Sequence, residues 1–235
     1  MKVTQYGDNL FQLTRYTFVN CFLVREDDGF TLVDAGMGGS GKAILEAAQK
    51  FGVPIRRITL THAHIDHVGS VDELHALLPD VEISISTRDS RFLTGDMSLD
   101  PGESSEKLRG GYPLVATKPT RLLNPGDKVG SLEVIASPGH TPGHVAFFDH
   151  RDGTLIAGDA YTNKAGMTTA GTLRLLFPLA AMATWSRLTG VHSAKTLLAL
   201  KPTQLAVGHG DTKVNPAKAM QSAIDETERY FKGKN

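Results

Sequence analysis

Hydrophobic and polar positions in the first third of the chain form a pattern that predicts strands and helices in alternation. Residues 16–24 and 30–33 are apolar enough to form a strand pair, and Asp27, Asp28 and Gly29 between them favour a tight turn. Residues 55–60 and 81–86 predict two further strands. Apolar side chains spaced three and four apart predict two helices. One begins after residues 38–40 and precedes the strand at 55–60, and the other follows that strand and ends at Pro79.

The rest of the chain repeats this order after a weakly patterned middle. Residues 88–118 are rich in Gly and Pro, which predicts a short helix and a long loop. Strands are predicted at residues 132–136, 145–148, 155–157 and 205–208. An apolar stripe from Met182 to Leu198 predicts a helix, and Asn215 and Pro216 are expected as N-cap and first residue of a final helix.

Each half of the chain thus contains strands, a helix and then a strand that ends in polar residues. Such halves bury their apolar faces by packing sheet on sheet with helices outside. The sequence therefore predicts an α+β fold, a four-layer αββα sandwich. No linker or low-complexity tract divides residues 1–235, so we expect a single domain.

Composition narrows the classes of partner. Lys plus Arg and Asp plus Glu both number 25, so the zero net charge gives no reason to expect a nucleic-acid or membrane partner. Cys21 is the only cysteine, which excludes an intrachain disulfide and a thiolate metal cluster. The first residues contain no secretory signal, and the apolar residues 173–183 are too short to span a membrane. We expect a cytoplasmic protein with a small-molecule substrate.

The strongest chemical signal is the run from Thr61 to His67, which follows a buried strand. It contains His62, His64, Asp66 and His67, and imidazole nitrogen and carboxylate oxygen are ligands that suit zinc, iron and manganese. The side chains of His62 and His64 can point the same way because they are alternate residues of a turn. Asp66 and His67 can then point to a second position next to the first. This spacing favours two metal ions over one. The alternative, a polar loop whose histidines bond to backbone, explains one histidine better than four such residues.

Three more strand ends carry residues of the same kind. His140 follows residues 132–136, Asp159 follows 155–157, and His209 follows 205–208. One Asp or His at a strand end is weak evidence, but three such ends strengthen one another. His144 begins the next strand after His140, and we expect it to be structural.

Together these motifs resemble the metallo-β-lactamase superfamily over almost the whole chain. The resemblance implies that His62, His64 and His140 bind one metal, that Asp66, His67 and His209 bind a second, and that Asp159 bridges them. It also implies that Asp34 supports the ligands from behind, although a simple turn residue is the alternative. A bridging Asp is typical of the glyoxalase II and lactonase branches, whereas true β-lactamases lack it.

The implied chemistry is hydrolysis by a metal-bridging hydroxide. Two divalent ions are expected per chain, zinc first, with iron or manganese as alternatives. Asp66 is expected to orient the hydroxide and accept a proton, and the substrate is expected to be an ester, lactone or thioester of a small apolar acyl group. Tyr161 lies near the position where lactonases of this superfamily place a tyrosine against the substrate carbonyl, so it is a second candidate catalytic residue, with a packing role as the alternative.

Several alternatives stay open at this point. Persulfide dioxygenases share the fold but use one iron held by two His and one Asp, here His62, His140 and Asp159. β-Lactam hydrolysis is a minor alternative, and a binding module without catalysis is disfavoured because no ligand is missing. The apolar residues 165–183 are either a wall of the substrate pocket or the interface of a homodimer.

Overall fold

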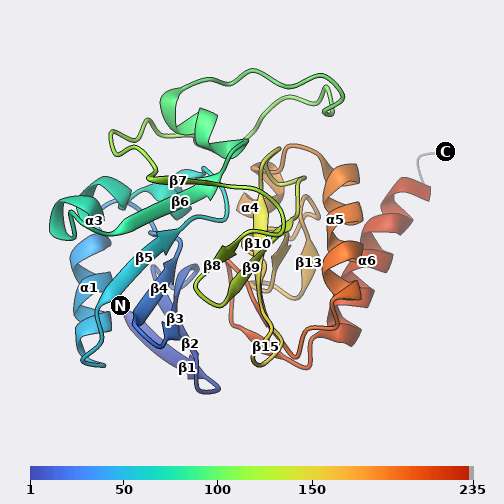
Figure 1. The fold of residues 1–235 in the computed structure, drawn as a ribbon. Coiled ribbons are helices and arrows are strands. Elements are labelled where there is room, and N and C mark those ends of the chain that lie inside the picture. The colour runs from blue at the N-terminus through green and yellow to red at the C-terminus, as the bar shows by residue number, and fades with distance from the viewer. Residues whose placement is uncertain (233–235) are drawn as a thin grey trace.

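A computed structural model describes residues 1–232, without the side chains of residues 230 and 232. The N-terminal half forms a seven-stranded sheet in the order β1 to β7 (Figure 1). Neighbours are antiparallel from β1 to β4 and parallel from β4 to β7. The strands are β1 Lys2–Tyr6, β2 Leu10–Arg15, β3 Val19–Glu26, β4 Gly29–Val33, β5 Ile55–Thr59, β6 Glu82–Ser86 and β7 Arg121–Leu123.

The C-terminal half forms a six-stranded sheet in the order β15-β14-β11-β10-β9-β8 and a small hairpin, β12 with β13. Neighbours in the larger sheet are antiparallel except β11 and β14, which run parallel. The strands are β8 Lys128–Val129, β9 Leu132–Ala136, β10 Val145–Asp149, β11 Thr154–Ile156, β12 Tyr161–Thr162, β13 Thr168–Thr169, β14 Gln204–Ala206 and β15 Lys213–Val214.

The longer helices cover the outer faces of the two sheets, as Figure 1 shows. Those beside the first sheet are α1 Gly41–Gln49 and α3 Val71–Leu77, and those beside the second are α5 Arg187–Ala199 and α6 Ala217–Lys232. The short elements are α2 Ile65–Val68, α4 Leu179–Met182 and a 3₁₀ helix, η1 Asp89–Thr94. None of the helices in the described part is both long and apolar enough to cross a membrane.

Three separate clusters of buried side chains hold these layers together. One joins α1 and α3 to the first sheet, for example Ile44 with Ile58, and another joins α5 and α6 to the second. The third lies between the sheets, where Phe22 and Val33 share a cluster with Phe147. The layers are therefore helix, sheet, sheet and helix, and the predicted four-layer αββα sandwich is confirmed.

Several predicted elements need correction. The strands that the sequence did not predict are β1, β2, β7, β8, β12, β13 and β15. The strand predicted from residue 16 begins at Val19, because Tyr16 and Thr17 have left-handed backbone angles. The helical stripe from residue 182 is divided, since Ser186 caps a new helix by accepting a hydrogen bond from Thr189 N–H. Asn215 has φ +50°, and the first helical bond of α6 runs to the carbonyl of Pro216, so the cap lies one residue later than expected.

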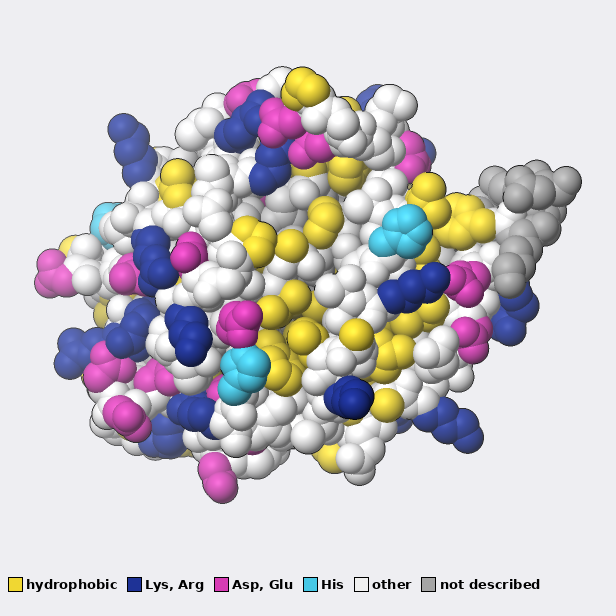
Figure 2. Space-filling view, turned by 45° about the vertical axis from the view of Figure 1, so that its right-hand side comes forward, with side chains coloured by type: hydrophobic (Ala, Val, Ile, Leu, Met, Phe, Trp, Pro, Cys, Tyr) yellow, Lys and Arg dark blue, Asp and Glu magenta, His cyan; other side chains and the backbone are white. Residues whose placement is uncertain are grey.

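Charged side chains are mixed over the surface that Figure 2 presents. On this face Lys and Arg lie next to Asp and Glu, around a hydrophobic centre. That face therefore carries no extended field of a single sign.

Candidate metal centre

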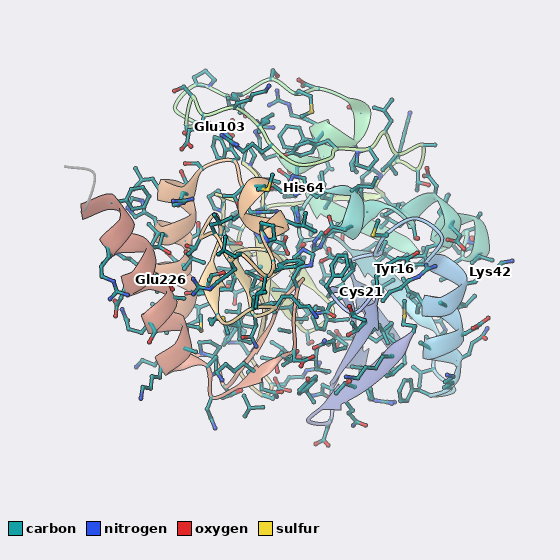
Figure 3. The ribbon with its side chains drawn as sticks, turned by 180° about the vertical axis from the view of Figure 1, so that it is seen from behind. Tyr16, Cys21, Lys42, His64, Glu103 and Glu226 are labelled. Atoms are coloured by element: carbon teal, nitrogen blue, oxygen red, sulfur yellow. The ribbon has the colours of Figure 1, made fainter. Side chains whose placement is uncertain are left out.

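Strand direction brings all seven predicted ligands to one edge of the sandwich. His62 and His64 follow β5, and Asp66 and His67 lie in α2. The other three follow strands of the second sheet that run in a common direction, namely β9, β11 and β14. The seven residues are His62, His64, Asp66, His67, His140, Asp159 and His209. Figure 3 shows His64 beside α4, near the middle of this side of the molecule.

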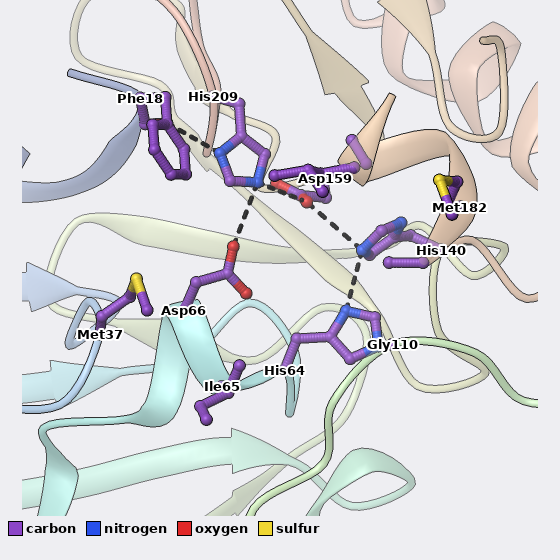
Figure 4. Close-up of a pocket in the computed structure, with 13 residues that line it drawn as sticks. Phe18, Met37, His64, Ile65, Asp66, Gly110, His140, Asp159, Met182 and His209 are labelled. Carbon is purple, nitrogen blue, oxygen red and sulfur yellow. Dashed lines mark hydrogen bonds and ion pairs between the residues drawn. The ribbon is translucent and has the colours of Figure 1, made fainter. Parts of the chain in front are cut away.

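The ligand atoms fall into three overlapping groups, within each of which the atoms lie no more than 4.8 Å apart. Asp159 connects the groups. Its Oδ2 lies 3.3 Å from His140 Nε2 and 3.1 Å from His209 Nε2 (Figure 4). Its Oδ1 lies 3.5 Å from His67 Nε2. The groups are His62, His64 and His140; His62, His67 and Asp159; and Asp66, His67 and His209. A carboxylate placed in this way can bridge two cations.

Each imidazole uses its second nitrogen to bond an oxygen behind the site, and this bond fixes its tautomer. His62 Nδ1 lies 3.0 Å from the Thr61 hydroxyl, which donates its own hydrogen to Asp34 and so accepts from His62. His67 Nδ1 donates to Asp34 Oδ2 at 2.8 Å, and His209 Nδ1 donates to the carbonyl of Phe18 at 2.8 Å. The Nε2 atoms of these residues therefore face the centre of the site.

The same logic applies to the remaining two histidines. His64 Nε2 donates to the carbonyl of Arg109 at 2.9 Å. His140 Nδ1 donates to the Thr184 hydroxyl at 2.9 Å, because that hydroxyl gives its hydrogen to the Ala180 carbonyl. The other nitrogens, His64 Nδ1 and His140 Nε2, then face each other as lone pairs only 3.0 Å apart. Two neutral lone pairs at this distance repel, and a cation between them removes the repulsion.

Buried atoms without partners give a further test of whether metal fits. His62 Nε2, His67 Nε2 and Asp159 Oδ1 are buried and have no hydrogen-bond partner. Buried polar atoms normally form hydrogen bonds. Three buried atoms without a partner in the same site therefore indicate that a bound ion or ligand belongs between them. The donor set of imidazole nitrogen and carboxylate oxygen, with no thiolate, suits two divalent ions such as zinc, iron or manganese.

The protonation states differ between the two sides of the site. Burial holds the pKa of His62 and of His140 well below its usual value and lowers the pKa of His64 to about 4. Burial also opposes a charge on His67, but attraction from Asp34, Asp159 and Asp66 outweighs it and raises the pKa of His67 to about 9. His209 is likewise raised, well above its usual pKa, by Asp159 and Asp66 against the effect of burial. The side next to the carboxylates thus attracts positive charge even without metal.

Asp34 lies directly behind the ligands and holds two of them in place. It follows β4 with a left-handed backbone (φ +64°), which turns its carboxylate toward β5. Oδ1 accepts from Thr61 N–H at 2.8 Å, and Oδ2 accepts from His67. The carboxylate therefore fixes His67 directly and His62 through the Thr61 hydroxyl.

Asp89 is a supporting residue that the sequence analysis missed. Its Oδ2 accepts from the backbone N–H of Ala63 at 3.0 Å and from the hydroxyl of Thr141 at 2.6 Å, and its Oδ1 accepts from Gly143 N–H at 2.7 Å. One buried carboxylate thus joins the loop of His62 and His64 to the loop of His140. A signal was present, because Asp89 follows β6 as the ligands follow their strands.

His144 has the structural role expected of it. Its Nδ1 bonds the Ser137 hydroxyl at 2.8 Å, and its Nε2 accepts from the backbone N–H of Asp159 at 3.1 Å. It thereby fixes the backbone that carries the Asp159 carboxylate.

The structure does not bring Tyr161 to the ligands. Its side chain is buried in the cluster between the second sheet and α5, and its hydroxyl donates to the carbonyl of Ala194 at 2.8 Å. The hydroxyl is therefore committed to α5, and Tyr161 does not line the cavity described next. This placement corrects the expectation of a catalytic tyrosine in favour of packing.

A cavity of about 450 Å³ opens over the ligands. Its wall includes four residues of the segment 165–183, so part of that segment lines the pocket. Gly110 comes so close to His64 that a Cβ there would lie 2.4 Å from Nε2, so any larger residue would force the imidazole to move. Apart from His64, Asp66, His140, Asp159 and His209, the lining consists of Phe18, Met37, Ile65, Gly110, Leu179, Ala180, Met182 and Ala183.

Residues 14–209 match the family described as the metallo-beta-lactamase superfamily, a stretch that contains every ligand named above. The chain belongs to the metallo-β-lactamase superfamily. It is 43% identical to protein YobT of Bacillus subtilis over 233 residues, which cover 97% of this chain and 100% of YobT. It is 32% identical to YflN of the same organism, named a probable metallo-hydrolase, over 80% of this chain and 78% of YflN.

More distant members bear names that describe chemistry. Hydroxyacylglutathione hydrolase GloC of Haemophilus influenzae is 29% identical over 60% of this chain and 65% of GloC. The protein TTHA1623, solved in a di-iron-bound form, is 26% identical with a TM-score of 0.63, over 92% of this chain and 97% of that one. The superfamily and these relatives establish a hydrolase fold whose members bind metal ions.

Proposed function

We propose that this superfamily member is a binuclear hydrolase that cleaves an ester, lactone or thioester of an apolar acyl group. The observation that carries the proposal is the set of three overlapping three-ligand groups, in which the group of His62, His67 and Asp159 shares one histidine with each of the other two. Around these groups five imidazoles turn one nitrogen each toward the centre. The name of TTHA1623 describes two irons in a relative, which supports a binuclear site. Zinc is our first choice for the native ions, with iron or manganese as alternatives.

When bound, two divalent ions supply a hydroxide at neutral pH and stabilise the charge that develops on the substrate oxygen. The protein's own groups do the rest. Asp66 has a quarter of its side chain exposed in the cavity, whereas the other six ligand residues are almost fully buried. We assign Asp66 to orienting the water and passing its proton to the leaving group, because its carboxylate is the accessible base.

The cavity lining supports an apolar acyl group. Beyond the ligands it contains no charged, hydroxyl or amide side chain, so a hydrocarbon group is matched there and a polar one is not. The complete second set of ligands favours hydrolysis over the mononuclear iron dioxygenase, which needs only three of these residues. The bridging Asp159 disfavours β-lactam hydrolysis as the main activity.

Elemental analysis of protein purified without added metal tests the binuclear site. We expect about two metal ions per chain and turnover across a panel of lactones, aryl esters and acyl thioesters. One tightly held iron per chain, with oxygen uptake on glutathione persulfide, would replace this proposal with the dioxygenase. Two bound ions without turnover of any of these substrates would refute the substrate class.

A further inference from the structure

Large apolar side chains cluster on the surface beside the cavity. Leu173, Leu175, Leu176, Leu179 and Met182 are each more than half exposed, and we call these five the exposed lip. Leu175 and Leu176 are 91% and 92% exposed, more than any other large hydrophobic side chain in the described part of the chain. Exposed apolar surface of this kind marks an interaction site when it is contiguous.

The segment that carries the exposed lip is held in place at several points. The guanidinium of Arg174 donates to Glu226 of α6 at 2.7 Å. Phe177 is largely buried, with its ring 5.7 Å from that of Phe18 and 5.1 Å from that of His209. Thr184, just beyond α4, bonds His140. The leucines are therefore presented by a fixed backbone.

The exposed lip is continuous with the cavity. Leu179 and Met182 belong to both, because they line the cavity and are also 55% and 63% exposed. Figure 4 shows Met182 on the side of the pocket next to His140. Leu179 and Met182 thus extend the apolar lining of the cavity onto the surface at α4, in the same chain segment as Leu173, Leu175 and Leu176.

The chemistry of this surface selects its occupant. Apart from the candidate metal ligands, no Lys or Arg lines the cavity to hold a carboxylate, and no hydroxyl or amide side chain lines it to hold a sugar or peptide. A hydrocarbon chain is the group that loses no hydrogen bond along the whole path and gains from burial. The cavity has room for about 15 groups of water size, at ~30 Å³ each. If a leaving group takes about half of that room, a chain beyond roughly eight carbons continues out of the cavity toward the exposed lip.

We propose that the substrate carries a long, unbranched acyl chain whose carbonyl lies at the metal ligands and whose distal methylenes lie on the exposed lip. This inference rests on the proposed hydrolase function. The reaction is ordinary hydrolysis: water adds its oxygen to the acyl carbon, the bond to the alcohol or thiol breaks, and that leaving group takes the proton.

A chain-length series tests the proposal. Metal-loaded protein is assayed with aryl esters from butanoate to dodecanoate, below their micelle concentrations, as wild type and as the Leu175→Ser/Leu176→Ser variant. Full burial of a methylene is worth about fourfold in binding, and contact with an open surface about half of that free energy, or about twofold. Removing four such contacts should lower kcat/KM for dodecanoate about 16-fold, through KM, and leave butanoate within twofold.

A matched control and a binding measurement complete the design. Leu114 is 75% exposed but does not line the cavity, so Leu114→Ser should behave as wild type with every ester. Calorimetric titration with 1-decanol and 1-butanol reports binding without turnover. Wild type should bind decanol far more tightly than butanol, and the double variant should lose most of that difference.

The outcomes separate the two proposals. Turnover that does not rise with chain length, or that rises equally in the double variant, overturns the acyl-chain inference and leaves the hydrolase standing. Length-dependent decanol binding without turnover of any lactone, aryl ester or acyl thioester refutes the hydrolase and supports the apolar path. A wild-type dimer by light scattering that becomes monomeric in the double variant, with unchanged length dependence, overturns the inference by making the exposed lip an interface between copies.

Discussion

Asparagine at position 89 would keep the shape of the buried side chain and replace one of its two accepting oxygens with an NH₂ group. Asp89 now accepts from Ala63 N–H, Gly143 N–H and the Thr141 hydroxyl, which together join the two loops of the first metal group. The threonine hydroxyl can turn to accept instead, but a backbone N–H cannot. In the Asp89→Asn variant, the backbone N–H of either Ala63 or Gly143 therefore loses its hydrogen-bond acceptor.

Two opposing effects set the stability of this variant. Burial raises the pKa of Asp89 from 3.8 to about 6, so near pH 7 the ionised carboxyl costs about 3 kcal/mol relative to a neutral group. Asparagine removes this cost but leaves a buried N–H unpaired, which costs about 1–3 kcal/mol. The free energy of unfolding of the metal-free variant should therefore change little at pH 7.

The sign of the pH dependence follows from the raised pKa. The stabilisation from protonated Asp89 is complete below its unfolded pKa of 3.8 and is lost as pH rises through about 6. The variant has no such group, so its stability relative to wild type should improve by about 1 kcal/mol between pH 5 and pH 7.5. Urea denaturation in the presence of a chelator measures this difference.

Metal affinity should respond much more strongly. Loss of an outer-shell hydrogen bond typically weakens metal binding 10- to 100-fold. We expect this loss of metal affinity at His62, His64 and His140 and little change at Asp66, His67 and His209. Competition with a chromophoric chelator measures both affinities. Exposed Asp80, changed to Asn, is the control. Unchanged affinity at both sites would refute the anchoring role, and a loss of several kcal/mol of stability would show that the hydrogen bonds outweigh the buried charge.

Three further variants or treatments test other parts of the site. Asp34→Asn should weaken the second metal 10- to 100-fold, because His67 loses its acceptor, and dialysis followed by elemental analysis would show a missing ion. Tyr161→Phe should lower the free energy of unfolding by about 1 kcal/mol and leave kcat/KM within twofold; a tenfold loss of turnover at normal metal content would restore a catalytic role. Chelation should abolish turnover and lower Tm, and rebinding of zinc near pH 7 should release protons from His67 and His209, seen by calorimetry in buffers of different ionisation enthalpy.

The seven candidate ligands could be selected from the sequence because five of them directly follow apolar strands and Asp66 and His67 lie in the next few residues; that these residues bind metal stays a prediction. That local signal survives without knowledge of the fold, since parallel strands deliver their carboxyl ends to one edge. The first strands were missed for a physical reason. In β2, the polar Gln12 is buried and bonds Thr212, about 200 residues away, so it interrupts the apolar pattern expected of a strand.

The partners of the second imidazole nitrogens could not be predicted. The acceptors for His209 and His64 are the backbone carbonyls of Phe18 and Arg109, which no side chain identifies. Thr184 meets His140 only because the segment before α5 folds back over the ligand loop. Such contacts depend on tertiary packing, so the sequence yields the ligands but not the orientation of their rings.

The protonation states explain how this edge of the sheet can fold before metal arrives. Asp34, Asp66 and Asp159 place three carboxylates around His67, and without compensation their charges would repel. The protons held by His67 and His209 supply that compensation, because the nearby carboxylates raise the pKa values of these two residues. Burial instead lowers the pKa values of His62 and His140, which stay neutral. A metal ion that binds Asp66, His67 and His209 must displace these protons. The histidines His62, His64 and His140 are already neutral and have no proton to lose from the nitrogens that face the centre. The two groups therefore differ in their dependence on pH although both consist mainly of imidazoles.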